Sequence, residues 1–105
     1  MPTNLYTGDQ YTEAGSLGTT TAGYGLKLKE GANAKLGTTA LAAGTATVTT
    51  TAITATSRVF LTAQTPGGTP GALYVQTRTA GTSFTVKSTS STDTSTVAWL
   101  IVDPA

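Results

Sequence analysis

The amino-acid sequence predicts an all-β protein: an antiparallel β-sandwich or jelly-roll-like domain that follows an irregular N-terminal arm. Thr, Ala, Gly and Ser supply 60 of the 105 residues, and Thr alone supplies 26. Thr is β-branched, so it favours strands and resists helices. Short segments of alternating apolar and polar residues recur about every 8–12 residues with turn-forming residues between them, which is typical of sandwiches. No stretch of useful length has helical periodicity.

The N-terminal segment, residues 1–25, is predicted to be the irregular arm. It is polar, rich in Gly and without periodicity. A free arm of this kind would be poorly ordered. If the arm is ordered, its Leu side chains and those of Tyr6, Tyr11 and Tyr24 need a cover, and a neighbouring subunit is one candidate.

Residues 26–105 are predicted to form the sandwich. Its expected strands are 26–30, 38–41, 45–50, 57–64, 72–78, 82–88 and 97–102, with a short extended stretch around Ile53. Turns or loops are expected at 31–35, 42–44, 65–71, 80–81 and 89–95, several of which are rich in Gly, Pro, Asp or Ser. A net charge of only +1 argues against disorder caused by charge repulsion.

The expected strands are defined by which residues share a face. In residues 26–30, Leu alternates with charged residues, which indicates a short strand with one face in water. In the later strands, one face carries Ala46 and Val48, then Val59, Leu61 and Ala63, then Leu73 and Val75, then Phe84 and Val86. The opposite face carries Arg58 and Phe60 in one strand and Tyr74, Gln76 and Arg78 in the next. Residues 97–102 are apolar throughout, so we expect this strand to be buried on both faces, with Trp99 in the core.

Composition excludes most kinds of chemistry. The chain has no Cys and no His, so it lacks disulfides, a thiolate zinc site, the usual general base and the commonest metal ligand. The net charge gives no electrostatic basis for nucleic-acid binding. No apolar run approaches the roughly 18 residues of a membrane span, and the N-terminus lacks a signal-peptide pattern. We therefore expect no enzyme, no catalytic residue, no metal or cofactor, and neither a nucleic-acid nor a membrane partner.

Two polar features are expected to be structural. Asp93 lies in a Ser/Thr-rich loop, where one carboxylate is a poor calcium site but a good loop cap. The Gly-rich segment 67–71 lacks the Lys and the helix of a phosphate-binding loop, so we interpret it as a hairpin loop.

A set of Tyr and Arg residues is the candidate site. Tyr74 and Arg78 are expected on one strand face, and Tyr and Arg are enriched at protein interfaces. The alternative is a solvated outer face. Stacking on a sugar ring is weakly supported, because only Gln76 adds an amide there. The candidate interface residues are Tyr6, Tyr11, Tyr24, Arg58, Tyr74 and Arg78.

The size of the core also predicts self-association. About 80 residues must form a core with few large side chains, and small scaffolds of this kind often need a further source of stability. With neither a disulfide nor a metal available, oligomerisation is the remaining one.

Several runs of residues point to a known family. The runs are LKEGANAKLG (28–37), AGTATV (43–48), SRVFLT (57–62), GTPG (68–71), RTAGTSF (78–84) and STDTSTVAWLIV (91–102). Over residues 27–105 the chain resembles a small β-rich structural domain of tailed-bacteriophage virion proteins. Such domains occur as head decorations, head fibres or tail-fibre tips.

This resemblance implies a structural protein of the virion, made and assembled in the bacterial cytoplasm. It implies a homo-oligomer, in particular a trimer, that contacts the major capsid protein or another virion protein. A short chain with an arm and no long fibre shaft favours a capsid decoration or cement protein that binds the capsid lattice. The alternative is a tail-fibre or spike tip domain that binds a receptor on the host cell surface.

Overall fold

The structure, a computed structural model, describes residues 10–13 and 16–105. These residues form eight β-strands and no helix, which confirms the all-β prediction. The strands are β1 (Gln10–Glu13), β2 (Ser16–Thr19), β3 (Leu36–Ala40), β4 (Thr45–Thr49), β5 (Arg58–Thr65), β6 (Leu73–Thr79), β7 (Ser83–Ser88) and β8 (Thr96–Val102). The described residues therefore contain no helix that could cross a membrane.

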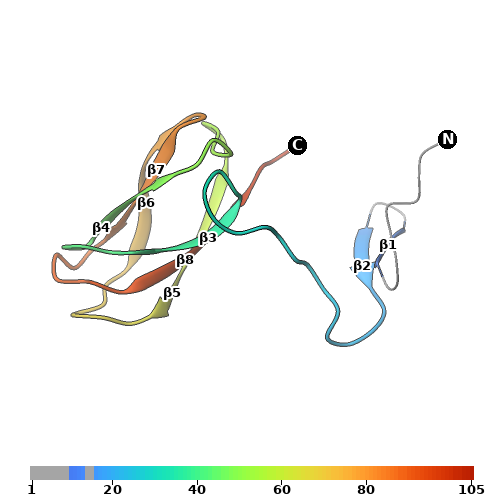
Figure 1. Cartoon of the computed structure of the whole chain (residues 1–105), viewed down its shortest axis with the longest axis horizontal. Helices are drawn as coiled ribbons and strands as arrows, with labels where there is room; N and C mark the ends of the chain where they lie inside the picture. The colour runs from blue at the N-terminus through green and yellow to red at the C-terminus, as the bar shows by residue number, and fades with distance from the viewer. Residues whose placement is uncertain (1–9, 14–15) are drawn as a thin grey trace.

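Six of the strands form the sandwich. Two antiparallel sheets of three strands, ordered β3-β8-β5 and β4-β7-β6, lie face to face (Figure 1). The chain changes sheet between β3 and β4 through the tight turn expected at 42–44, where Ala43 and Gly44 have positive φ angles of 52° and 76°. It changes sheet again before β5, before β6 and before β8. The two central strands, β7 and β8, are therefore consecutive in the chain but belong to different sheets.

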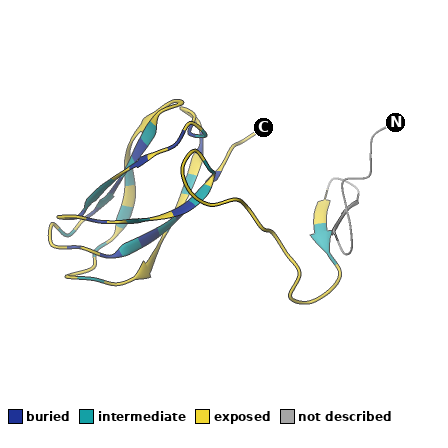
Figure 2. Cartoon of the chain, in the orientation of Figure 1, coloured by how far each residue is buried: buried dark blue, intermediate teal, exposed yellow. Residues whose placement is uncertain are grey.

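The core lies between the two sheets, where the inward-facing side chains of the strands meet (Figure 2). Alternate residues of β7 and β8 are buried, as a period of two requires. The buried apolar residues are Leu41, Val48, Ile53, Phe84, Val86, Val97, Trp99 and Ile101. Phe84 and Trp99, one from each central strand, meet edge to face with ring centroids 5.4 Å apart. The predicted core position of Trp99 is confirmed.

The last strand differs from its prediction. Residues Val97, Trp99 and Ile101 are buried, but Leu100 on the outer face is only half-buried and Val102 is exposed. The expectation that β8 is buried on both faces is therefore wrong for the single chain. The reason is that the second face of its sheet has no further layer of described residues over it.

The segment before the sandwich also differs from its prediction. Within the arm, β1 and β2 pair as a short antiparallel hairpin that lies apart from the two sheets (Figure 1). The strand expected at 26–30 does not form, because no described strand lies beside it. Only Glu30 pairs, through a single parallel bridge to Leu36.

Candidate functional site

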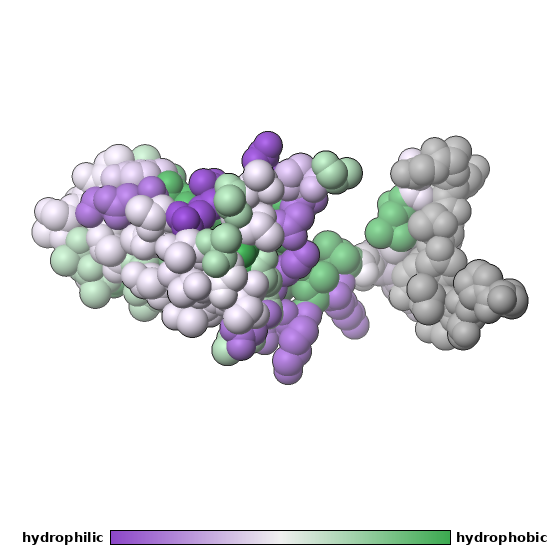
Figure 3. Space-filling view, turned by 90° about the horizontal axis from the view of Figure 1, so that it is seen from above, coloured by the Kyte–Doolittle hydropathy of each residue, from purple (hydrophilic) through white to green (hydrophobic). Residues whose placement is uncertain are grey.

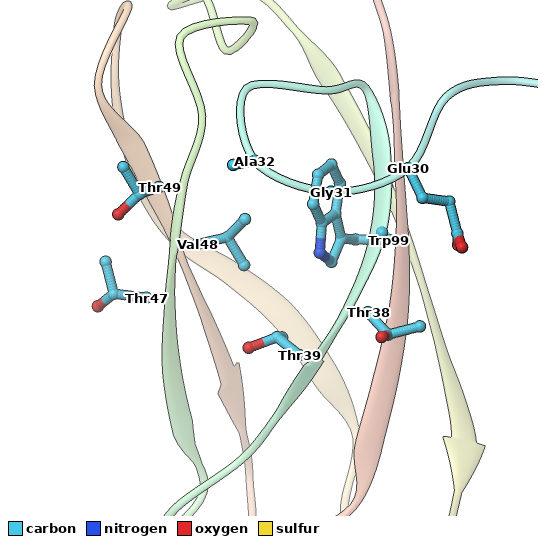
Figure 4. Close-up of a pocket in the computed structure, with 10 residues that line it drawn as sticks. Glu30, Gly31, Ala32, Thr38, Thr39, Thr47, Val48, Thr49 and Trp99 are labelled. Atoms are coloured by element: carbon cyan, nitrogen blue, oxygen red, sulfur yellow. The ribbon is translucent and has the colours of Figure 1, made fainter.

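A groove opens between the edge strands β3 and β4, on one side of the sandwich. It encloses about 420 Å³ and runs between the two sheets. Its lining residues are Glu30, Gly31, Ala32, Gly37, Thr38, Thr39, Thr47, Val48, Thr49 and Trp99. Figure 4 shows Val48 and Trp99 pointing into the space between the strands, whereas Thr47 and Thr49 point away from it.

The indole of Trp99 is held in this groove by a close approach of backbone. Gly37 is the residue opposite Trp99 in the ladder between β3 and β8. A Cβ atom on Gly37 would lie 2.6 Å from Cζ2 of the indole, which is closer than real Cβ contacts. The absence of a side chain at Gly37 therefore makes room for the ring.

The indole nitrogen is an unusual polar group. Trp99 is only 3% exposed, and its Nε1 has no hydrogen-bond partner among the described residues. An indole N–H can only donate, and a buried donor without an acceptor costs free energy. The indole N–H is therefore a buried donor without an acceptor in the described part of the chain, beneath the surface of the groove and out of contact with solvent.

The walls of the groove are free strand edges. Leu41 N donates to Ser95 O (3.0 Å) and Ile101 N donates to Lys35 O (2.7 Å). The odd-numbered residues of β3 therefore bond to β8, and the backbone of Thr38 faces the open edge.

The same argument applies to β4. Ser88 N donates to Gly44 O (2.8 Å) and Thr50 N donates to Thr82 O (3.0 Å), so the even-numbered residues bond to β7. The backbone groups of Thr47 and Thr49 consequently face the groove without a ladder partner. The groove thus presents backbone donors and acceptors on both walls above an apolar floor.

The two sides of the sandwich differ in how their edges are protected. The opposite edge strands, β5 and β6, each contain an Arg and a register shift, between Ala63 and Thr65 and between Val75 and Thr77. Bulges and charges are the usual devices that prevent a further strand from pairing with an edge. Strands β3 and β4 pair regularly and contain no charged residue. The strands on the groove side therefore lack both devices, and of the described residues only the preceding loop, which lines the groove with residues 30–32, lies against their edges.

The sequence-predicted interface residues whose side chains the structure describes do not gather on one surface. Arg58 lies on the outer face of the β3-β8-β5 sheet, opposite Val102, and its guanidinium donates to Thr56 O (2.8 Å). Tyr74 is exposed on the outer face of the other sheet, opposite Lys87. Tyr24 is exposed in the segment that follows β2.

The expectation that Tyr74 and Arg78 share a face is wrong. The bulge at Gln76 shifts the register, so Thr77 pairs with Thr85 and Arg78 pairs with Phe84. Phe84 faces the core, whereas Tyr74 faces outward. One inserted residue reverses the alternation of a strand.

Two of the predicted residues lie outside this description. Tyr6 is outside the described residues. Tyr11 lies in β1, but the description there covers the backbone alone.

Asp93 has the structural role that its loop predicts. The carboxylate is 1% exposed and accepts hydrogen bonds from Ser88 Oγ (2.7 Å), Gly71 N (2.9 Å) and Ser95 N (2.9 Å). Hydrogen bonds from Ser95 and Ser88, with the backbone of Gly71, hold the pKa of Asp93 well below its usual value. Its oxygens are thus fully used by protein donors, and the described residues contain no cluster of three or more acidic side chains that could hold a metal ion.

The groove between β3 and β4 was missed by reasoning from the sequence. Both strands were expected, but nothing in a single sequence assigns them to sheet edges. Residues 36–49 contain no charged residue, and Gly37 lies beside a predicted strand. Natural edge strands usually carry charges, so this pattern alone favours inner strands over edge strands.

Comparison with known proteins identifies the fold's family. No curated protein shows significant similarity to the chain. Residues 33–102, about two thirds of the chain, match the family model of the C-terminal domain of K1 capsule-specific polysaccharide lyase. This match covers all six strands of the sandwich and supports the expected likeness to β-rich phage domains. The chain therefore belongs to the family of the C-terminal domain of K1 capsule-specific polysaccharide lyase, a β-rich domain related to phage tail spikes.

Proposed function

We propose that this chain is a non-catalytic structural module of a phage tail spike or tail fibre. The observation that carries the proposal is the family match across the whole sandwich, because that family is named for the C-terminal domain of a capsule-specific polysaccharide lyase and is related to phage tail spikes. Among the two functions expected from the resemblance, the match favours the tail over the capsid lattice.

The module's role in this proposal is assembly and presentation rather than chemistry. The chain has no His or Cys to act as base or nucleophile. The buried carboxylate of Asp93 is occupied by three protein donors and is not available to a substrate. The spike that carries the module would act at a cell-surface polysaccharide, and the module would join copies of the spike to one another.

The partner in this proposal is a further copy of the same chain, in particular in a trimer. Support comes from the small core and from the exposed apolar residues outside it, such as Phe60, Leu26 and Val102. A single chain leaves these side chains in water, and an assembly would cover part of them.

Copy number on purified virions tests the proposal. The amount of this chain is measured by quantitative mass spectrometry against the major capsid protein and against a known tail protein. We expect the ratio to match the tail protein, a few to a few tens of copies per particle. A ratio near one copy per capsid subunit would instead establish a capsid decoration protein. Absence from the particle would remove both functions.

A further inference from the structure

The groove side of the sandwich has the properties of an acceptor for one more strand. The edges of β3 and β4 are five residues long, pair regularly with their sheets and carry no charge. Backbone groups of Thr38, Thr47 and Thr49 face the groove without a ladder partner. An extended chain that adds to such an edge gains main-chain hydrogen bonds.

A segment of this same chain has the properties of the missing strand. Residues 26–30 alternate Leu with charged residues over five positions, which is long enough to span the free part of either edge. The segment is exposed, and no hydrogen bond joins residues 26–29 to any other described residue. Leu26 is 75% exposed and Leu28 is 39% exposed. Figure 3 shows hydrophobic side chains beside hydrophilic ones where this segment leaves the sandwich.

We infer that residues 26–30 of one copy add as a strand to the β3–β4 side of a second copy. Leu26 and Leu28 then face inward, over Val48 and the indole of Trp99, and Lys27 and Lys29 face solvent. The inference goes beyond the proposed function, because it concerns how copies join and not where on the virion they lie.

A second copy fits this role better than the chain's own segment. Glu30 pairs with Leu36 in parallel, and Gly31 N donates to Leu36 O (3.1 Å). In a parallel pair, the residues before Glu30 run beside those before Leu36, away from the groove. Residues 26–29 therefore run away from their own sandwich (Figure 1). A head-to-tail exchange of this kind closes into a ring when the rotation between copies allows it.

Engineered disulfides test the pairing, and the absence of native Cys makes them unambiguous. In the inferred pairing, outward Lys29 lies beside outward Thr47 or Thr49 of the second copy, at the spacing of cross-strand neighbours. Copies that carry Lys29→Cys are mixed with mass-tagged copies that carry Thr47→Cys or Thr49→Cys. Mild oxidation should give a disulfide between the two kinds of copy.

The matched control uses the protected edge of the same sheet. Thr77 is also an exposed, outward-facing Thr on an edge strand, but its strand is bulged. Mixtures of Lys29→Cys with Thr77→Cys should give no cross-link. Equal cross-linking to Thr77 would overturn the inference. A chain with both Lys29→Cys and Thr47→Cys that closes within a monomer would also overturn it.

Sedimentation of segment variants is an independent test. Leu26→Ser with Leu28→Ser should dissociate the oligomer, and Lys27→Ser with Lys29→Ser should leave it intact. All four side chains lie outside the core, so neither double substitution should unfold the sandwich. A wild-type chain that sediments as a monomer, or equal effects of both pairs, would overturn the inference. Hydrogen exchange gives one further outcome. If the amides of Thr38, Thr47 and Thr49 become protected only when capsular polysaccharide is added, the inference is overturned.

Discussion

Asp93 illustrates at the residue scale how a polar group can stabilise a β-rich core with few large side chains. Its carboxylate joins the end of β7, the start of β8 and the loop before β6 through three hydrogen bonds. Hydrogen bonds to a charged acceptor are shorter and stronger than neutral ones. A single side chain thus joins three segments of the chain.

Asp93→Asn should destabilise the fold. The amide keeps the shape but removes the charge and turns one acceptor into a donor that faces the donors of Ser88 and Gly71. We expect the melting temperature to fall by roughly 5 °C or more. Circular dichroism during heating measures the melting temperature. Glu30→Gln, at an exposed carboxylate, is the matched control and should change it little. Equal effects would argue against the anchoring role.

The same carboxylate predicts how stability depends on pH. Hydrogen bonds depress the folded-state pKa of Asp93, and Lys35 and then Ser57 depress that of Asp103. The folded state therefore binds fewer protons than the unfolded state below pH 5 or so. The stabilisation that these two carboxylates contribute is complete above the unfolded-state pKa, about 3.9. It is lost as the pH falls through their folded-state pKa values.

Urea unfolding midpoints at several pH values between 7 and 3 measure this pH dependence of stability. The midpoint should stay constant down to about pH 5 and then fall. Asp93→Asn should flatten the decline, since its own contribution is gone. A midpoint that rises on acidification would contradict the assignment.

Gly37→Ala tests the close approach under Trp99. The new Cβ would lie 2.6 Å from Cζ2 and 2.9 Å from Cε2 of the indole, so the ring or the strand must move. Overpacking of this kind costs about 1–3 kcal/mol. Trp99 is the only Trp, so its fluorescence reports the displacement directly. Gly25→Ala, where a Cβ meets nothing within 4 Å, should leave both stability and fluorescence unchanged.

At the scale of elements, strand alternation decides which aromatic residues hold the sheets together. Phe84 faces inward from β7 and is fully buried against Trp99, whereas Phe60 faces outward from β5 and is 59% exposed. Both positions were assigned to their faces from the sequence. The two Phe residues therefore form a natural comparison of buried and exposed positions.

Phe84→Ala should cost about 3–5 kcal/mol of unfolding free energy, which is a large share of the stability of a small domain. Phe60→Ala should cost less than about 1 kcal/mol in the monomer. Urea denaturation of both variants under conditions that keep the chain monomeric gives the comparison. Similar losses would mean that the outer face of the β3-β8-β5 sheet is covered in the folded protein.

At the scale of the whole molecule, the sandwich is closed on one side and open on the other. Bulges and Arg residues protect β5 and β6, and β3 and β4, which lack both devices, flank the groove. Next to that groove, the chain leaves the sandwich through an extended, unpaired segment with exposed Leu residues. A tail module that joins copies would use both features together.

The sequence by itself determined the all-β class, the inward faces of most strands, the core position of Trp99 and the loop anchor at Asp93. These follow from local rules: a period of two, β-branched composition and the turn chemistry of Gly, Pro and Asp. The tertiary structure alone decided which strands are neighbours, so it alone decided which edges are free. It also decided the bulge at Gln76, which separates Tyr74 from Arg78, and it left residues 26–30 without a partner strand. Pairing depends on contacts between residues far apart in the chain, and a strand pattern specifies a face but not the neighbour that completes it.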